Sequence, residues 1–210
     1  MSHPVPPFTS PPPAVVALRQ ATLASHAALE ATPVAQGMLQ GHITRQAYGQ
    51  TLAVLEVLHR VVEPALVQDA ELWAVFGRTL GRRAAGRRDL AVLGITPLAP
   101  GHPLEIFALE LVAQRPELLG AAFLVEGSRA GSALVAPRLA QTFALPLTPG
   151  VGLDFHLAER PALPWPAILG QIGQLPWTNA EFARAGTAAA RLMDALVPLF
   201  AAIEPRAGGP

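Results

Sequence analysis

Apolar residues recur every three or four positions along most of the chain, which is the period of an amphipathic helix. A stripe that contains Leu18 and Leu29 predicts a first helix over about 14–31. A second stripe predicts a helix over about 44–66, with Thr44 as its N-cap. No alternating pattern long enough for a β-strand occurs. The pattern therefore predicts an all-α protein.

The middle and the C-terminal part of the chain also have helical spacing. Glycines and prolines divide this part, because glycine weakens a helix and proline is tolerated chiefly in its first turn. The predicted helices cover, in chain order, about 70–93, Leu104–Gln114, Glu117–Phe143, Trp165–Gln174 and 178–203. Thr178 and Glu181 have the spacing of a capping box at the start of the last one.

The length of 210 residues favours one domain. Prolines crowd residues 1–13, so we expect a disordered arm there. We expect the tail 204–210 to be flexible. The sequence thus predicts a single-domain multi-helix bundle over 14–203.

Charge and cysteine content exclude several classes of protein. Fifteen basic and fifteen acidic residues give a net charge of zero, unlike the basic balance of a nucleic-acid binder. The chain has no Cys, which removes disulfides and thiolate metal sites. No signal-peptide pattern and no uncharged apolar run of the ~18 residues needed to span a bilayer occurs. We therefore expect a cytoplasmic protein that binds neither nucleic acid nor membrane.

A cluster of arginines stands out against this neutral balance. Its members are Arg78, Arg82, Arg83, Arg87 and Arg88. One interpretation is a solvated helix face; the other is a docking patch for an acidic redox partner.

His26 falls on the apolar stripe of the first helix, where a solvent-facing histidine is not expected. Its spacing allows two interpretations, a buried histidine with a hydrogen-bond partner or a metal ligand. Arg19 lies nearly two turns away on the same face, about 10 Å along the axis. An imidazole could bind haem iron there, while Arg19 paired a carboxylate at the edge of the same ligand.

Gly127 and Gly131 are four residues apart, so they present a strip without Cβ atoms on one helix face. This strip suits either close helix packing or close approach of the backbone to a ligand. Ser128 and Ser132 add hydroxyl groups that could hold water beside such a ligand.

Glu56-x-x-His59 has the spacing of one half of a di-iron site in a helix bundle. A second copy of the motif is missing, so the sequence disfavours that site. No hydrolase triad motif and no phosphate-binding glycine loop is present.

Four short segments, taken in order, carry a resemblance to a known family. They are Leu18–Thr22 with His26 and Leu29-Glu30, then Tyr48–Leu66, Arg87–Gly94 and Glu126–Ser132. Over about 14–145 the chain resembles the biliverdin-producing haem oxygenases, particularly the bacterial type that supplies the chromophore of bacterial phytochromes.

The resemblance implies an all-α bundle with haem held between a proximal and a distal helix. Haem b would be both substrate and cofactor, cleaved with O₂ and external electrons to biliverdin, CO and iron. The implied partners are an electron donor such as a ferredoxin or a flavin reductase, and a bacterial phytochrome. His26 would be the axial ligand of the iron. The implied site residues form a catalytic set, Gly127, Ser128 and Gly131, and a haem-binding set, Arg19, His26, Gly127, Gly131 and Ser132.

Three departures from the family pattern affect the site. Ser132 stands where many members have a second glycine, and Ser128 stands where mammalian-type enzymes have an Asp. The segment Trp165–Gln174 has no basic residue for the haem propionates. These departures leave open a second hypothesis, a haem-oxygenase-like protein that carries haem or contacts a phytochrome without turnover.

Overall fold

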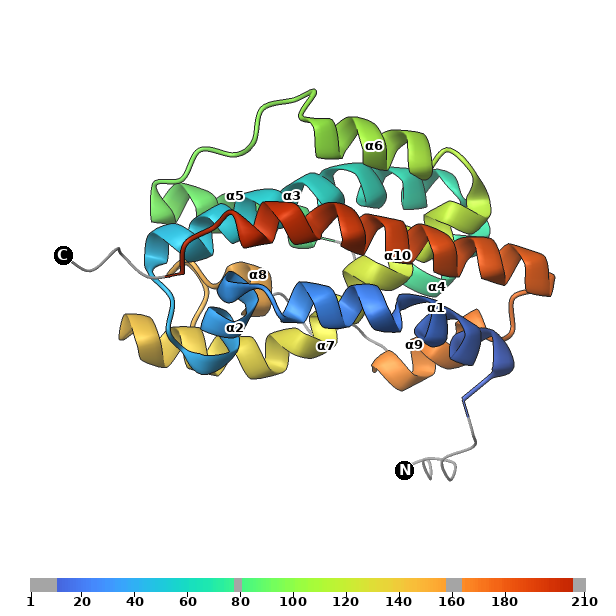
Figure 1. Cartoon of the computed structure of the whole chain (residues 1–210), viewed down its shortest axis with the longest axis horizontal. Coiled ribbons are helices and arrows are strands. Elements are labelled where there is room, and N and C mark those ends of the chain that lie inside the picture. The colour runs from blue at the N-terminus through green and yellow to red at the C-terminus, as the bar shows by residue number, and fades with distance from the viewer. Residues whose placement is uncertain (1–10, 78–80, 158–163, 206–210) are drawn as a thin grey trace.

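The computed structural model describes residues 11–77, 81–157 and 164–205, and within these ranges it contains helices, turns and loops but no strand (Figure 1). Most of the expected arm 1–13, Arg78 and the last part of the expected tail lie outside the described residues. The helices are α1 (Pro13–Glu30), α2 (Pro33–Gln40), α3 (Arg45–Gln68), α4 (Ala70–Phe76), α5 (Arg82–Leu93), α6 (Pro103–Leu111), α7 (Arg115–Phe143), α8 (Asp154–Leu157), α9 (Trp165–Ile172) and α10 (Asn179–Ala201). The predicted all-α bundle is confirmed.

The long helices begin where their capping residues predict. The Thr44 side chain accepts a hydrogen bond from the Ala47 N–H at the start of α3. At the start of α10, Thr178 and Glu181 form both halves of the predicted capping box. These contacts satisfy N–H groups that have no partner inside the helix, so they fix where each helix starts.

Two short helices, α2 and α8, were not predicted. Proline follows Thr32 in the first turn of α2, and Gly41 ends this helix with a left-handed φ of 72°. These are the usual start and stop signals. The helix has only eight residues, however, so its apolar residues repeat too few times to reveal a helical period in the sequence. The four-residue helix α8 falls in a stretch whose glycines and prolines predict a loop.

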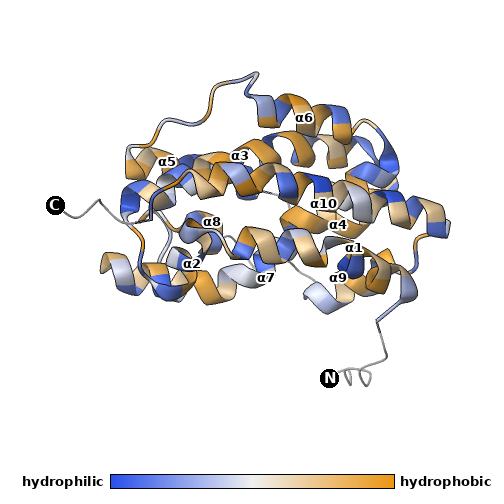
Figure 2. Ribbon diagram, in the orientation of Figure 1, coloured by the Kyte–Doolittle hydropathy of each residue, from blue (hydrophilic) through white to orange (hydrophobic). Residues whose placement is uncertain are grey.

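Helix α10 runs beside α1 and packs on α7, so the C-terminal helix closes the bundle (Figure 1). Small residues permit this approach. A Cβ atom on Gly120 of α7 would collide with the carbonyl of Ala185, and one on Gly186 would lie 2.7 Å from Cβ of Ala21. Most helices carry both hydrophobic and hydrophilic residues, as amphipathic packing requires (Figure 2).

Helix α7 is bent by 43° between its segments Arg115–Arg129 and Gly131–Phe143. Gly131 lies at the bend and Pro137 follows within two turns. The bend is explained by these two residues, because glycine and proline both weaken a helix. Among the described residues, no single helix has the length and apolar character to cross a membrane; the bent pair in α7 meets the test by length and composition only.

Candidate functional site

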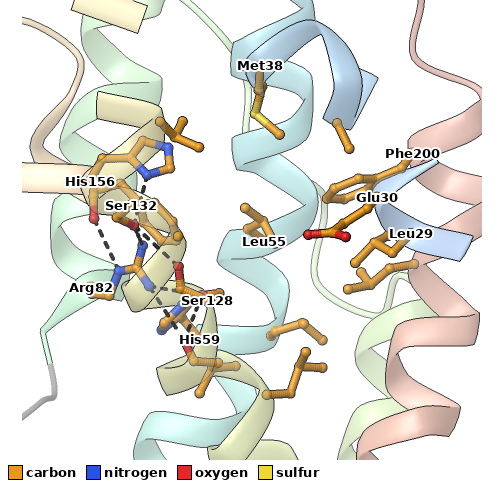
Figure 3. A pocket seen from close by; sticks show the side chains of 18 of the residues that line it. Leu29, Glu30, Met38, Leu55, His59, Arg82, Ser128, Ser132, His156 and Phe200 are labelled. Atoms are coloured by element: carbon orange, nitrogen blue, oxygen red, sulfur yellow. Dashed lines mark hydrogen bonds between the residues drawn. The ribbon is translucent and has the colours of Figure 1, made fainter. Parts of the chain in front are cut away.

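A cavity of about 190 Å³ is lined by residues of α1, α2, α3, α5, α7, α8 and α10. Its walls are mostly apolar and include Leu29, Met38, Leu55, Leu124, Val135 and Phe200. Polar side chains gather on one side, where α5, α7 and α8 meet, and Glu30 lies on the opposite side (Figure 3). An apolar cavity with a few convergent polar groups is the usual form of a small-molecule site.

Arg82 is the centre of the polar side, although it is only 1% exposed. Its guanidinium donates hydrogen bonds to Ser128 Oγ at 3.0 Å and Ser132 Oγ at 2.9 Å on α7. Nε donates to the carbonyl of Phe155 at 3.1 Å, and the guanidinium lies 3.9 Å from the centroid of the Phe155 ring. These contacts hold a cation from α5 against the bent part of α7.

No carboxylate forms an ion pair with Arg82 within the described part of the chain. Burial disfavours its charged form and lowers its pKa to about 10, so the group still carries its charge at neutral pH. A buried cation without a paired anion is costly in free energy. Such a group is rarely kept for stability alone, and it favours negative charge in the adjoining cavity.

Two histidines also line the cavity, His59 from α3 and His156 from α8. The Nδ1 atom of His59 is 3.0 Å from Glu63 Oε1, and that of His156 is 3.0 Å from Ser132 Oγ. Burial and the Arg82 charge lower the pKa of His156 to about 3; burial lowers that of His59 to about 4 despite Glu63. Both imidazoles are therefore neutral at physiological pH.

Asp89 of α5 anchors the short helix that carries His156. Its two carboxylate oxygens accept the N–H groups of Asp154 at 2.8 Å and Phe155 at 2.7 Å. Burial raises the pKa of Asp89 to about 6 in spite of these hydrogen bonds. Asp154 in turn accepts a hydrogen bond from Arg88 at 3.0 Å. Helix α5 thus sets the position of both Arg82 and α8.

His26 does not lie where its position on the apolar stripe predicts. Its side chain is 56% exposed, and the neighbouring Ser25 is buried in its place. His26 Nδ1 lies 3.5 Å from Glu30 Oε2, and Glu30 lines the cavity. No described residue contacts His26 Nε2 through a hydrogen bond or ion pair. The expectation of a buried histidine is therefore wrong. His26 does not itself line the cavity, and its contact with Glu30 is what connects it to the cavity wall.

The structure brings together only part of the predicted site. Ser128, Gly131 and Ser132 line the cavity, and a Cβ atom on Gly131 would meet nothing within 4 Å. Gly127 does not line it, because the indole of Trp165 would lie 3.5 Å from a Cβ there. Arg19 is exposed on α1. The roles of these residues stay predictions.

Three cavity residues were not predicted as members of this site. Arg82 belongs to the arginine cluster. Among the cluster's described members, only Arg87 and Arg88 are fully exposed, as a solvated face would require. His59 stood out only through its spacing from Glu56, and His156 lies in the unpredicted helix α8. The sequence does carry a signal for the start of α5, because Gly81 precedes Arg82 and adopts a φ of 110° as the N-cap of this helix. That signal places Arg82 in the first turn of α5.

Glu56 is fully buried and faces arginines rather than other metal ligands. Its carboxylate oxygens lie 3.6 Å from Arg60 Nη1 and 3.6 Å from Arg83 Nε. Within the described ranges, no group of three or more His, Cys, Asp or Glu side chains could hold a metal ion. The disfavoured di-iron interpretation has no support in the structure.

Comparison with known proteins identifies the family. The sequence profile described as "Heme oxygenase" matches residues 13–160, which is more than half of the chain. The chain belongs to the haem oxygenase family. It is therefore an enzyme of haem degradation, with haem as both substrate and cofactor. No curated protein sequence matches it.

Solved haem oxygenases share its fold at low identity. The enzyme of Leptospira interrogans has a TM-score of 0.74 and 16% identity, covering 90% of this chain and 98% of its own. Haem oxygenase-1 of the cyanobacterium Synechocystis, in complex with haem, has a TM-score of 0.72 and 17% identity, covering 89% and 90%. The NO- and CO-bound enzyme of Neisseria meningitidis has a TM-score of 0.66 and 21% identity, covering 89% and 89%.

The residues around the cavity fit haem in this family fold. A ligating histidine usually donates its second ring N–H to a carboxylate, and Glu30 lies in that position beside His26 Nδ1. The cavity offers apolar walls and, at Gly131, a stretch of helix without a side chain. Both features suit a flat macrocycle that approaches the backbone of α7.

Proposed function

We propose that the protein binds haem through His26 and opens it with O₂ and external electrons to biliverdin, CO and iron. The observation that carries this proposal is the contact of His26 with Glu30, a residue that lines the same cavity as Ser128 and Gly131. When bound, haem supplies the iron that activates O₂ and the porphyrin ring that is cleaved. The protein's own residues hold this group and control its surroundings.

On the proximal side, His26 would offer Nε2 to the iron. The carboxylate of Glu30 lies 3.5 Å from Nδ1. A small closing of this distance would let it accept from Nδ1, which would fix the ring and raise the basicity of Nε2. Arg19 lies seven residues earlier on the exposed face of the same helix and would pair a haem propionate. This single cation replaces the basic residues that the segment Trp165–Gln174 lacks.

On the distal side, Arg82 would stabilise negative charge that develops over the haem face. It is fixed before the reaction by Ser128, Ser132 and Phe155, so no reorganisation is needed when charge appears. Ser128 stands where an Asp organises water in mammalian-type enzymes, and its hydroxyl is held by both Arg82 and the carbonyl of Val125 at 2.7 Å. In this protein, Arg82 would position the polar groups near the haem, a role that the Asp has in mammalian-type enzymes.

The partners of the reaction follow from the same proposal. Electrons would come from an acidic donor such as a ferredoxin or a flavin reductase, which would dock near the exposed arginines of α5. The biliverdin product would suit a bacterial phytochrome as its recipient. A cytoplasmic location stays a prediction.

Haem titration followed by turnover tests the proposal. Adding haem to the pure protein should give a Soret band that saturates at one haem per chain. Reductase and O₂ should then remove this band and produce the absorption of biliverdin. A Soret band that persists under these conditions would favour the non-catalytic carrier, and no Soret band at all would remove the proposal.

A further inference from the structure

The hydroxyl group of Ser132 has a defined direction. Arg82 has only donors, so Ser132 Oγ accepts from its Nη2 at 2.9 Å. Two acceptors are near the hydroxyl hydrogen, His156 Nδ1 at 3.0 Å and the Ser128 carbonyl at 3.5 Å. The second distance is longer than a normal hydrogen bond. Ser132 therefore donates to His156 Nδ1.

This direction assigns the tautomer of His156. Nδ1 accepts a hydrogen bond, so the single proton of the neutral ring is on Nε2. The positive charge of Arg82 acts in the same sense, because it opposes a second proton on the ring. His156 Nε2 has no partner among the described residues, and the ring lines the cavity. His156 thus presents a donor there.

His59 is in the opposite state. Its Nδ1 lies 3.0 Å from Glu63 Oε1, and the same carboxylate accepts the N–H groups of Arg83 at 2.8 Å and Gly81 at 3.2 Å. Burial alone would raise the pKa of Glu63, but the hydrogen bonds from His59 and the backbone lower it overall. An ionised carboxylate only accepts, so His59 must donate from Nδ1. Its Nε2 is then an acceptor.

We infer that the protein holds its two cavity histidines in opposite tautomers, with His156 as an Nε2–H donor and His59 as an Nε2 acceptor. Ser132 is the positioning residue for the first and Glu63 for the second. Phe155 keeps the rings apart, since each meets it edge-on at a centroid distance of 5.3 Å. A water molecule that joined the two Nε2 atoms would accept from His156 and donate to His59.

The inference gives Ser132 a role that its position in the family pattern does not suggest. A glycine at this position would leave both Arg82 and His156 without the hydroxyl that joins them. Ser132 then serves to order the polar side of the cavity. The inference rests on the proposed function only in treating this side as the one that faces bound O₂.

Nitrogen NMR of the haem-free full-length protein tests the inference directly. Long-range proton–nitrogen spectra of protein labelled with ¹⁵N-histidine distinguish a protonated from an unprotonated ring nitrogen. We expect a protonated Nε2 for His156 and a protonated Nδ1 for His59, with assignments from His156→Gln and His59→Gln. His102 is an internal reference, because its Nδ1 accepts the Leu104 N–H at 3.2 Å and its proton is therefore on Nε2.

Variants at Ser132 separate positioning from a general structural role. Ser132→Ala should end the exclusive Nε2–H state of His156 and leave His59 unchanged, whereas Ser132→Thr should restore the wild-type pattern. The inference would be overturned if His156 and His59 had the same tautomer in the wild type. It would also be overturned if the His156 spectrum were unaltered in Ser132→Ala. The wild-type spectrum alone decides the tautomers if Ser132→Ala does not fold. The spectra are recorded without haem, so they report the tautomers even if the protein proves not to bind haem.

Discussion

Arg82 and Phe155 are joined twice, by a hydrogen bond from Nε to the Phe155 carbonyl and by the guanidinium lying 3.9 Å from the ring centroid. The pair links the start of α5 to α8 on the polar side of the cavity. A cation over an aromatic face gains stabilisation that grows when water is excluded. Since no described carboxylate pairs with Arg82, the ring and the two serine hydroxyls are its main support.

Replacing Arg82 by Met should lower turnover by on the order of 10- to 100-fold. This loss reaches the lower end of the loss in kcat that follows removal of one hydrogen-bond donor to a developing negative charge. Haem affinity should change little, because the cavity walls remain apolar. Single-turnover kinetics and haem titration measure the two effects separately. Arg138→Met is the matched control, since Arg138 is an exposed arginine on α7. Turnover in Arg82→Met equal to that of the control would exclude an electrostatic role.

Replacing His26 by Ala should abolish the axial nitrogen bond without weakening the fold. The side chain is 56% exposed, so the free energy of unfolding should stay within about 0.5 kcal/mol of the wild type. Added imidazole should restore part of the haem spectrum, since it can occupy the vacated ligand position. Gln20→Ala, an exposed change on the same helix, should alter neither property. An unaltered haem spectrum in His26→Ala would show that the proximal ligand is another residue.

Replacing Gly131 by Ala should separate stability from function. A Cβ there meets nothing within 4 Å, so the fold should gain up to about 1 kcal/mol from the better helix former. The same methyl group would project into the cavity, and haem affinity or turnover should fall. Gly170→Ala in α9 also adds a Cβ to open space but lies outside the cavity. It should give the gain in stability with normal haem binding.

Long apolar periods and capping residues made most of the fold predictable. The predicted 14–31 corresponds to α1 at Pro13–Glu30, and the capping box at Thr178 starts α10 as expected. Short helices were missed, because α2 and α8 have eight and four residues. Their positions depend on tertiary contacts, such as the Asp89 carboxylate that holds the first turn of α8.

The site was predicted less completely. Side chains of neighbouring residues on a helix point in directions about 100° apart, so an error of one position changes which residue faces inward. A cluster of arginines therefore does not tell which member points inward. Arg82 is 1% exposed while its neighbour Arg83 is partly exposed and pairs with Glu56. The same difference separates the buried Ser25 from the exposed His26. A period assigned by eye cannot resolve neighbours that both lie near the edge of an apolar stripe.

Reversing the charge of Arg87 tests the docking of an acidic electron donor. Arg87 is exposed on α5, and Arg88 beside it is already paired with Asp154. Arg87→Glu should slow electron transfer at low ionic strength by lowering the association rate, and the effect should shrink as salt screens it. Haem affinity should be unchanged. Equal rates in the variant and the wild type at low salt would remove α5 from the docking surface.

Acid should destabilise the protein between about pH 6.5 and pH 4 through the cavity histidines. His59 has its pKa lowered to about 4, whereas in the unfolded chain it titrates near 6.5. The unfolded state therefore binds more protons in this window, and stability falls as the pH is lowered. At pH 4.5 the loss from His59 is roughly 2–3 kcal/mol. His156, with its pKa lowered to about 3, acts in the same direction.

Asp89 should oppose this loss in part. Its pKa is raised to about 6 in the folded state, so lowering the pH through that value removes the cost of its buried charge and stabilises the protein. Chemical unfolding between pH 4 and 8 measures the balance. His59→Gln should flatten the decline below pH 6.5, whereas Asp89→Asn should steepen it. A decline that is identical in His59→Gln and wild type would mean that His59 is not held neutral in the fold.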